Sequence, residues 1–195
     1  TFILCGALAI IALIGGVCFF SAFQSGNASL VGTIASAFVV PTVILSVIFF
    51  GERLNGAQVG AIIVIVIGLV ITSLDFESLR QRRSILDRSV ALSLLAMLIW
   101  GVYYAFIRVP VEQIGWFLPS YIGYLFSPLV LVMMRWQQVP LQSPFVRSAL
   151  IPFVLMMVLS TVANLGYNVG ISSGYTSIVA PIAASYPVLF VILSS

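Results

Sequence analysis

Long runs without a charged residue constrain the fold of this chain more than any other feature. Each run is about as long as the helix that crosses the hydrocarbon core of a bilayer. Lipid offers no partner for backbone N–H and C=O groups, so segments of this kind must pair those groups internally, as helices. The sequence therefore predicts an all-α membrane protein, a polytopic helical bundle with seven transmembrane helices. The seven runs are residues 1–22, 29–50, 56–74, 90–107, 115–134, 149–170 and 176–195.

Composition supports this class and argues against several functions. The chain is 62% hydrophobic and 7% charged, whereas soluble domains carry about 25% charged residues. It has no histidine, no Cys/His metal spacing and no carboxylate pair within a run, so we predict neither an enzyme nor a cofactor or metal. The net charge of +3 comes from scattered arginines, which does not indicate a nucleic-acid partner. The predicted partners are the lipid bilayer and a small-molecule solute.

Two segments of the chain resemble each other, which predicts a duplicated unit. The twenty residues from Ala28 align without a gap with those from Thr176, at an offset of 148, and nine positions are identical. The second of these helices is the fifth predicted crossing after the first, and an odd number of crossings reverses direction. The pattern predicts an inverted repeat, an architecture of secondary transporters in which the substrate site lies near the bilayer midplane. At the same offset, the chain would form the middle seven helices of a ten-helix protein.

The motif Gly-Glu-Arg-Leu at 51–54 follows a small-residue helix with an internal proline and precedes a glycine-bearing helix. This element resembles the end of an EamA-type repeat of the drug/metabolite transporter superfamily, and the Trp100–Gly101 pair resembles the start of the next repeat. The resemblance implies two inverted five-helix halves around a central cavity. It also implies export of metabolites, amino acids or drugs, in this case across the inner cell membrane. On this basis residues 1–74 are the last three helices of the first repeat, 75–89 the linker, and 90–195 the first four helices of the second. Without the first two helices and the last, a cavity built from this chain alone would be incomplete.

Polar residues within the runs indicate where a solute could bind, since lipid offers them no partner. Ser160, Asn164 and Asn168 are spaced by four on one helix face, with Tyr167 at its border. They could line a path for a polar substrate, or their amides could bond to a neighbouring helix. Trp100, Tyr103 and Tyr104 lie within about one turn. They could contact an apolar or cationic ligand, or they could lie at the bilayer interface. The predicted substrate-binding residues are Trp100, Tyr103, Ser160, Asn164, Tyr167 and Asn168.

Prolines and glycines mark predicted hinges and turns. Pro41 and Pro187 each remove a backbone hydrogen bond within a run, so kinks are expected there, with a hinge role as one interpretation. Gly51, Glu52 and Arg53 form a predicted structural turn in which the Glu52 carboxylate lies near the free N–H groups of helix 56–74. An alternative is that Glu52 carries a proton or binds substrate. Gly56 and Gly60, four residues apart, are expected to allow close helix packing.

The sequence thus predicts a secondary transporter that works by alternating access. A non-transporting scaffold or receptor-like membrane protein is the main alternative, and a narrow channel is a third. Two criteria disagree on orientation. Six arginines fall on one membrane face and two, Arg53 and Arg108, on the other, which places the 75–89 linker in the cytoplasm. The family resemblance places that linker outside.

Overall fold

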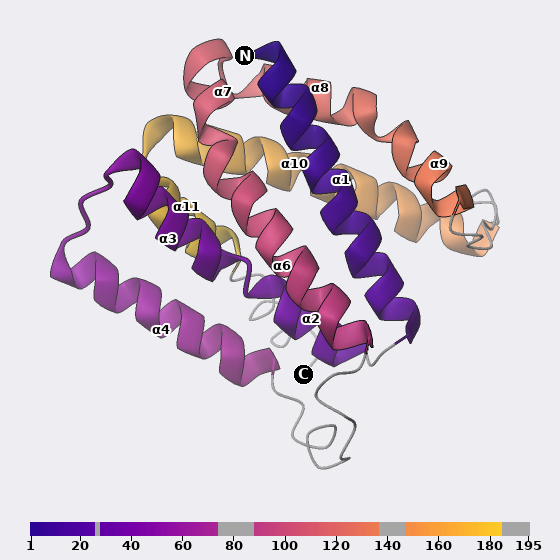
Figure 1. The fold of residues 1–195 in the computed structure, drawn as a ribbon, viewed down its shortest axis with the longest axis horizontal. Coiled ribbons are helices and arrows are strands. Elements are labelled where there is room, and N and C mark those ends of the chain that lie inside the picture. The colour runs from indigo at the N-terminus through magenta and orange to yellow at the C-terminus, as the bar shows by residue number, and fades with distance from the viewer. Residues whose placement is uncertain (26–27, 74–87, 137–146, 185–195) are drawn as a thin grey trace.

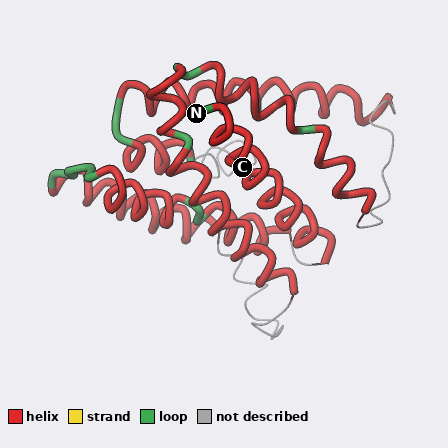
Figure 2. Tube along the Cα trace, turned by 45° about the horizontal axis from the view of Figure 1, so that its top comes forward, coloured by secondary structure: helices red, strands yellow, loops and turns green. Residues whose placement is uncertain are grey.

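The computed structural model describes residues 1–25, 28–73, 88–136 and 147–184, and the regular structure within these ranges is helical (Figure 2). The predicted all-α fold is confirmed for this part of the chain. In chain order the helices are α1 (Phe2–Ser25), α2 (Ala28–Ser36), α3 (Val39–Phe50), α4 (Gly56–Ser73), α6 (Arg88–Phe106), α7 (Arg108–Ile114), α8 (Phe117–Phe126), α9 (Pro128–Trp136), α10 (Arg147–Ser173) and α11 (Thr176–Ala183).

Several of these helices are suited to a bilayer by length and composition. Among the described residues, 3 helices are long and apolar enough to cross a membrane: Phe2–Gln24, Arg88–Ile114 and Phe153–Ser173. Shorter apolar helices cover Ile34–Phe50, Gly56–Gly68 and Phe117–Phe126. The chain is therefore a helical membrane protein, while the count of seven spans stays a prediction.

Helix α6 lies between α1 and α3 near the middle of the bundle (Figure 1). Its buried face carries mainly small side chains: Ser89, Ser93, Ala96, Gly101 and Ala105. Its exposed face carries larger ones: Leu94, Leu95, Leu98 and Val102. Small residues at a helix interface let backbones approach closely where hydrocarbon surrounds the bundle. The small residues on the buried face of α6 thus allow its neighbours to pack close to its backbone.

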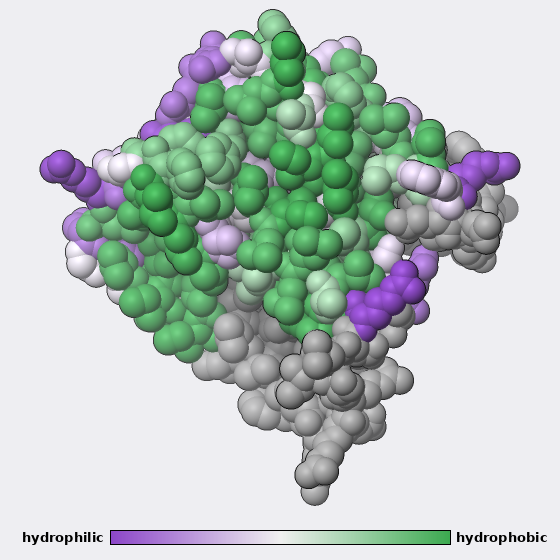
Figure 3. Space-filling view, viewed as in Figure 1, coloured by the Kyte–Doolittle hydropathy of each residue, from purple (hydrophilic) through white to green (hydrophobic). Residues whose placement is uncertain are grey.

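The outer surface is apolar. Figure 3 shows hydrophobic residues over most of one face, with hydrophilic residues at its rim. Large side chains such as Ile151 (76% exposed) and Val162 (62% exposed) lie uncovered on α10. An apolar surface of this extent marks contact with a membrane.

Two predicted spans are interrupted at prolines. The predicted span 29–50 is divided into α2 and α3, and 115–134 into α8 and α9. Pro41 has no N–H to donate to Ala37 O, and that carbonyl instead accepts from Val40 N at 3.0 Å. Likewise Tyr124 O, four residues before Pro128, accepts from Ser127 N at 3.1 Å. The kink expected at Pro41 is therefore present, as a break before α3.

Three parts of the chain meet at one end of the bundle: residues 51–55, 107–112 and 174–177. We call this the Glu52 end; it lies beside α7 in Figure 1. Helix α3 finishes there, whereas α11 starts there and packs along α3, so these two helices run in opposite directions. An inverted repeat requires opposed directions for the segments from Ala28 and Thr176. The repeat itself remains a prediction.

The apolar core connects distant segments of the sequence. It gathers residues from α1, the α2–α3 break, α3, α6–α7, α10 and α11, so the two predicted repeats share one interior. Its buried members are Leu8, Phe38, Val39, Ile107, Val111, Tyr167, Ile171, Ala180 and Ala184.

Candidate functional site

The turn at residues 51–53 has the backbone conformation that the sequence indicates, but its side chains contact residues other than those expected. Gly51 ends α3 with φ 61°, in the left-handed region that glycine favours. Glu52 is buried, whereas Arg53 is exposed. The two residues therefore face different surroundings and do not act as a pair.

The expectation that Glu52 lies at the N-terminus of α4 is wrong. Asn55 and Gln58 cap that helix: Gln58 N donates to Asn55 Oδ1 and Asn55 N donates to Gln58 Oε1, each at 2.9 Å. This reciprocal pair is a capping box, which satisfies two free backbone donors from within the helix's own first turn. Helix α4 therefore needs no carboxylate from Glu52.

The Glu52 carboxylate instead receives the start of α11. Thr176 N donates to Oε1 and Ser177 N to Oε2, each at 2.9 Å, and Ser177 Oγ also donates to Oε2. Arg108 Nη1 forms an ion pair with Oε1. An anion at a helix N-terminus is stabilised by the free N–H groups and by the helix dipole. Glu52 thereby joins the α3–α4 loop to α6–α7 and α11.

Arg108 is fixed from more than one side. Its Nε donates to Glu112 Oε1 at 2.5 Å, and its guanidinium carbon lies 5.4 Å from the centre of the Phe50 ring. The carboxylates and the aromatic face compensate the cost of placing a cation beside the apolar core.

Sequence reasoning missed Arg108, Thr176 and Ser177 as partners of Glu52. One signal was available, because alternating the membrane sides places Arg108 on the same face as Glu52. No local pattern indicates the contact with α11, since the hydrogen-bonded residues are 124 positions apart.

A row of aromatic rings runs through the interior, and we call it the aromatic column. Its rings come from α1, the α2–α3 break, α6 and α10. In order they are Phe19, Trp100, Phe38, Tyr104 and Tyr167, with successive centroids 5.0, 6.5, 4.7 and 4.9 Å apart. Offset-stacked and edge-to-face contacts at these separations are favourable. The column therefore links residues of both predicted repeats through successive contacts between aromatic rings.

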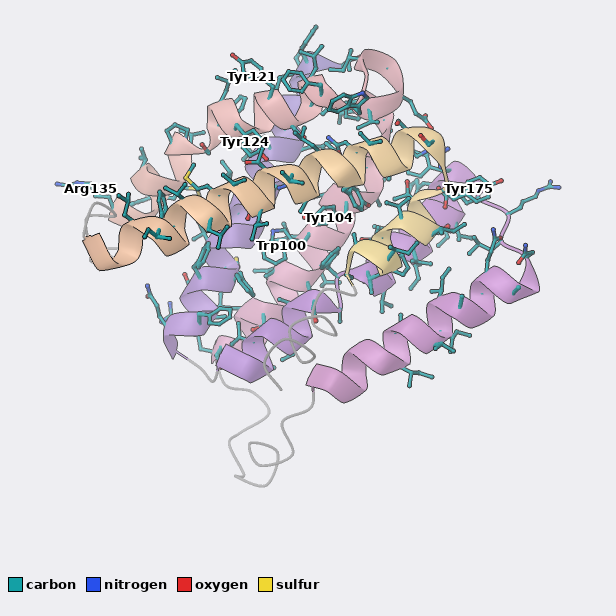
Figure 4. The ribbon with its side chains drawn as sticks, turned by 180° about the vertical axis from the view of Figure 1, so that it is seen from behind. Trp100, Tyr104, Tyr121, Tyr124, Arg135 and Tyr175 are labelled. Carbon is teal, nitrogen blue, oxygen red and sulfur yellow. The ribbon has the colours of Figure 1, made fainter. Side chains whose placement is uncertain are left out.

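Trp100 and Tyr104 lie on α6 beside the crossing with α10 (Figure 4), and both pack against the apolar core. Trp100 Nε1 donates to Ala12 O at 3.3 Å, and a Cβ added to Gly15 would lie 2.7 Å from the indole. The indole of Trp100 therefore packs inward against α1, while its contact with a ligand stays a prediction. Gly15 provides the room that the ring needs.

The two other predicted tyrosines also belong to the interior. Tyr167 is buried and its hydroxyl donates to Tyr104 O at 3.0 Å. The ring of Tyr103 lies edge-on to Tyr104, 5.0 Å away, and packs against the core. The structure thus places Trp100, Tyr103 and Tyr167 together.

The predicted polar face of α10 is divided between different environments. Ser160 is exposed, and Asn164 Nδ2 donates to Ser160 O within the same helix. Asn168 is buried and its Nδ2 donates to Trp116 O at 3.0 Å and to Ser120 Oγ at 2.8 Å. Asn168 therefore makes the bonds to a neighbouring helix that the second interpretation describes. A role of these three residues in solute binding stays a prediction.

This difference gives a testable contrast. Asn168→Leu is expected to lower the free energy of unfolding by about 1–2 kcal/mol, because it removes two bonds to the α8 segment. Asn164→Leu, which removes only a bond within α10, is expected to change it by less than about 0.5 kcal/mol. Thermal unfolding of the purified proteins in detergent measures both. Equal losses would show that Asn168 does not connect α10 to α8 in this way.

Pro41 lies in a close contact between α3 and α6. A Cβ added to Gly101 would lie 2.5 Å from Pro41 Cγ and 3.3 Å from Phe38 O. Thr42 Oγ1 lies 2.9 Å from Phe38 O and 3.2 Å from Gly101 O, so its single proton is shared between the backbone before α3 and that of α6. The hinge role of Pro41 stays a prediction, and Pro187 lies outside the described residues.

The expected packing at Gly56 and Gly60 is wrong. Both glycines are exposed, and a Cβ added to either would meet no atom of the described residues within 4 Å. Close packing occurs instead at Gly170, where an added Cβ would lie 2.9 Å from Val179 Cγ1 of α11. Spacing alone does not show which glycines face a neighbour.

The titratable side chains form no cluster suited to a metal. Within the four described ranges, no group of three or more Cys, Asp, Glu or His side chains comes together.

Comparison with known proteins places the chain in a family. The sequence profile of the EamA-like transporter family matches residues 1–74 and 88–195. No curated protein and no solved structure matches the chain. The profile covers every helix described above.

Proposed function

Because the chain belongs to the EamA-like transporter family, we propose that it is a secondary transporter that moves a small organic solute by alternating access. The solute would contact the aromatic column and the neighbouring Tyr103. The proposed direction is export, and the proposed solutes are metabolites, amino acids or drugs. The inner cell membrane is the proposed location.

The aromatic column carries this proposal. Its rings come from α1 and the α2–α3 break on one side and from α6 and α10 on the other. A rocking motion of the predicted halves would therefore change the spacing of these rings. Alternating access requires a solute surface shared between two such halves.

The chemistry of the column indicates the kind of solute. Aromatic faces attract flat apolar groups and cations, and a tyrosine hydroxyl adds a hydrogen-bonding group. The buried ion pair at Glu52 is occupied by α11 and Arg108. A flat, weakly hydrated solute with at most one positive charge fits these surroundings best.

Flux measurements on the full-length protein test this function. The protein is reconstituted in liposomes, and entry of ethidium and of radiolabelled aromatic amino acids is followed. We expect Tyr104→Leu to reduce the flux by about tenfold or more, since stacking on an aromatic face contributes about 0.5–1.5 kcal/mol or more to each contact. Tyr121→Leu is the matched control, because Tyr121 is 52% exposed and lies at the outer edge of the bundle (Figure 4).

The outcomes separate the candidate functions. Equal flux in the two variants would remove the aromatic column from the solute path. A correctly inserted protein that moves none of the probes would favour the scaffold or receptor-like alternative. Flux much faster than a conformational cycle would favour a channel.

A further inference from the structure

The contact between Glu52 and α11 joins segments that belong to different predicted repeats. Glu52 follows α3, whereas Thr176 and Ser177 begin α11. The residues that form the contact are sealed from water: Glu52 is 5% exposed, and Thr176 and Ser177 are 0% exposed. The contact therefore closes the Glu52 end between these helices.

Helix α11 depends on Glu52 for its N-terminal cap. The preceding residue, Tyr175, forms no side-chain cap, and the buried Thr176 Oγ1 has no hydrogen-bond partner in the part of the chain that the structure describes. The backbone N–H groups of Thr176 and Ser177 thus use an acceptor far away in the sequence. If Glu52 leaves, water must reach these groups, because a buried unpaired donor is costly.

The same reasoning applies to the carboxylate. Glu52 takes three hydrogen bonds from α11 and an ion pair from Arg108. Without α11, the buried carboxylate would keep only Arg108 and would need water in place of the lost donors. The contact would therefore be stable in two arrangements, dry and closed or hydrated and open, with few intermediates between them.

We propose that Glu52 is a latch that holds the Glu52 end of the bundle closed, and that its release from α11 opens this end to water. As a step in transport, the latch rests on the function proposed above. Arg108 supports it by holding the carboxylate from the α7 side through its bonds to Glu52 and Glu112.

A cysteine at position 176 reports on the latch with little disturbance. Thr176→Cys removes no side-chain hydrogen bond, because Oγ1 has no partner among the described residues, and the residue keeps its backbone bond to Glu52. The native Cys5 and Cys18 are replaced by alanine in the full-length protein. Labelling by a membrane-impermeant methanethiosulfonate is then followed in opened membranes, where the reagent reaches both faces.

Glu52→Gln is expected to speed labelling of Thr176→Cys by about tenfold, because the amide loses the ion pair and the charge-assisted bonds. Arg108→Gln is expected to have a smaller effect in the same direction, since it leaves the bonds to α11 in place. Ser93→Cys is the control: Ser93 is 0% exposed on α6, away from the latch. Its labelling should stay slow in every background.

Two results would overturn the latch. One is unchanged labelling of Thr176→Cys in Glu52→Gln, with Ser93→Cys still protected. The other is faster labelling at both positions, which would mean that Glu52 only maintains the fold. If the Glu52→Gln protein does not insert into the membrane, the labelling is measured in Arg108→Gln instead. The same two results would then overturn the latch. Labelling does not depend on flux, so a latch that responds in a protein that moves no probe would count against the transport function and leave the latch intact.

Discussion

Replacing Glu52 with alanine is expected to lower the free energy of unfolding by about 3–5 kcal/mol, because it leaves a cation and buried donors without their partner. The lost groups are the acceptors for Thr176 N, Ser177 N and Ser177 Oγ and the counter-ion of Arg108. Few single truncations in a small bundle cost so much. Thermal unfolding of the purified protein in detergent, followed by size-exclusion chromatography, measures the loss.

Glu112→Ala is the matched control. Glu112 also pairs with Arg108, but its side chain is 50% exposed, and an exposed pair of this kind contributes less than about 1 kcal/mol. A similar loss in both variants would mean that the Arg108 ion pair, and not the contact with α11, dominates the stability at the Glu52 end. A loss below about 1 kcal/mol for Glu52→Ala would mean that water replaces the carboxylate without difficulty.

Gly101→Ala is expected to destabilise the protein by about 1–3 kcal/mol, although alanine is the better helix former. The new methyl group would lie 2.5 Å from Pro41 Cγ and 2.8 Å from Pro41 Cβ. The proline ring is rigid and cannot rotate away, so α3 and α6 must separate. That separation also lengthens the bond from Thr42 Oγ1 to Gly101 O.

Gly60→Ala provides the opposite case. Gly60 is also within a helix, but an added Cβ meets no atom of the described residues within 4 Å. Its substitution should leave stability unchanged or raise it by up to about 1 kcal/mol. Both variants are compared by their unfolding temperatures in the same detergent. Effects of the same sign at the two positions would show that helix propensity, and not the contact with Pro41, decides the result.

The sequence predicted the helices well because hydrocarbon leaves the backbone few alternatives. The uncharged runs locate α1, α4, α6 and α10 to within a few residues, and Gly51 adopts the expected turn. The breaks before α3 and α9 follow from the missing N–H of Pro41 and Pro128, although the extent of a break depends on neighbouring helices.

The contacts between helices were harder to predict from the sequence. Two glycines four residues apart give a helix one face without side chains, but their spacing does not show whether another helix packs on that face. The sequence predicts close packing at Gly56 and Gly60, whereas the structure has it at Gly101 and Gly170. Similarly, a spacing of four places Asn164 and Asn168 on one face. Because α8 packs against one part of α10, Asn168 bonds to a residue of α8, whereas Asn164 bonds within α10.

The distance along the chain between Glu52 and the residues that donate hydrogen bonds to it has a consequence for synthesis of the chain. Thr176 follows Glu52 by 124 residues, which a ribosome adds in roughly 6–25 s at about 5–20 residues per second. Arg108 follows by only 56 residues and emerges in less than half that time. The Arg108 guanidinium can therefore neutralise the Glu52 carboxylate while the nascent chain is being inserted. The hydrogen bonds from Thr176 and Ser177 form later, once α11 has been synthesised.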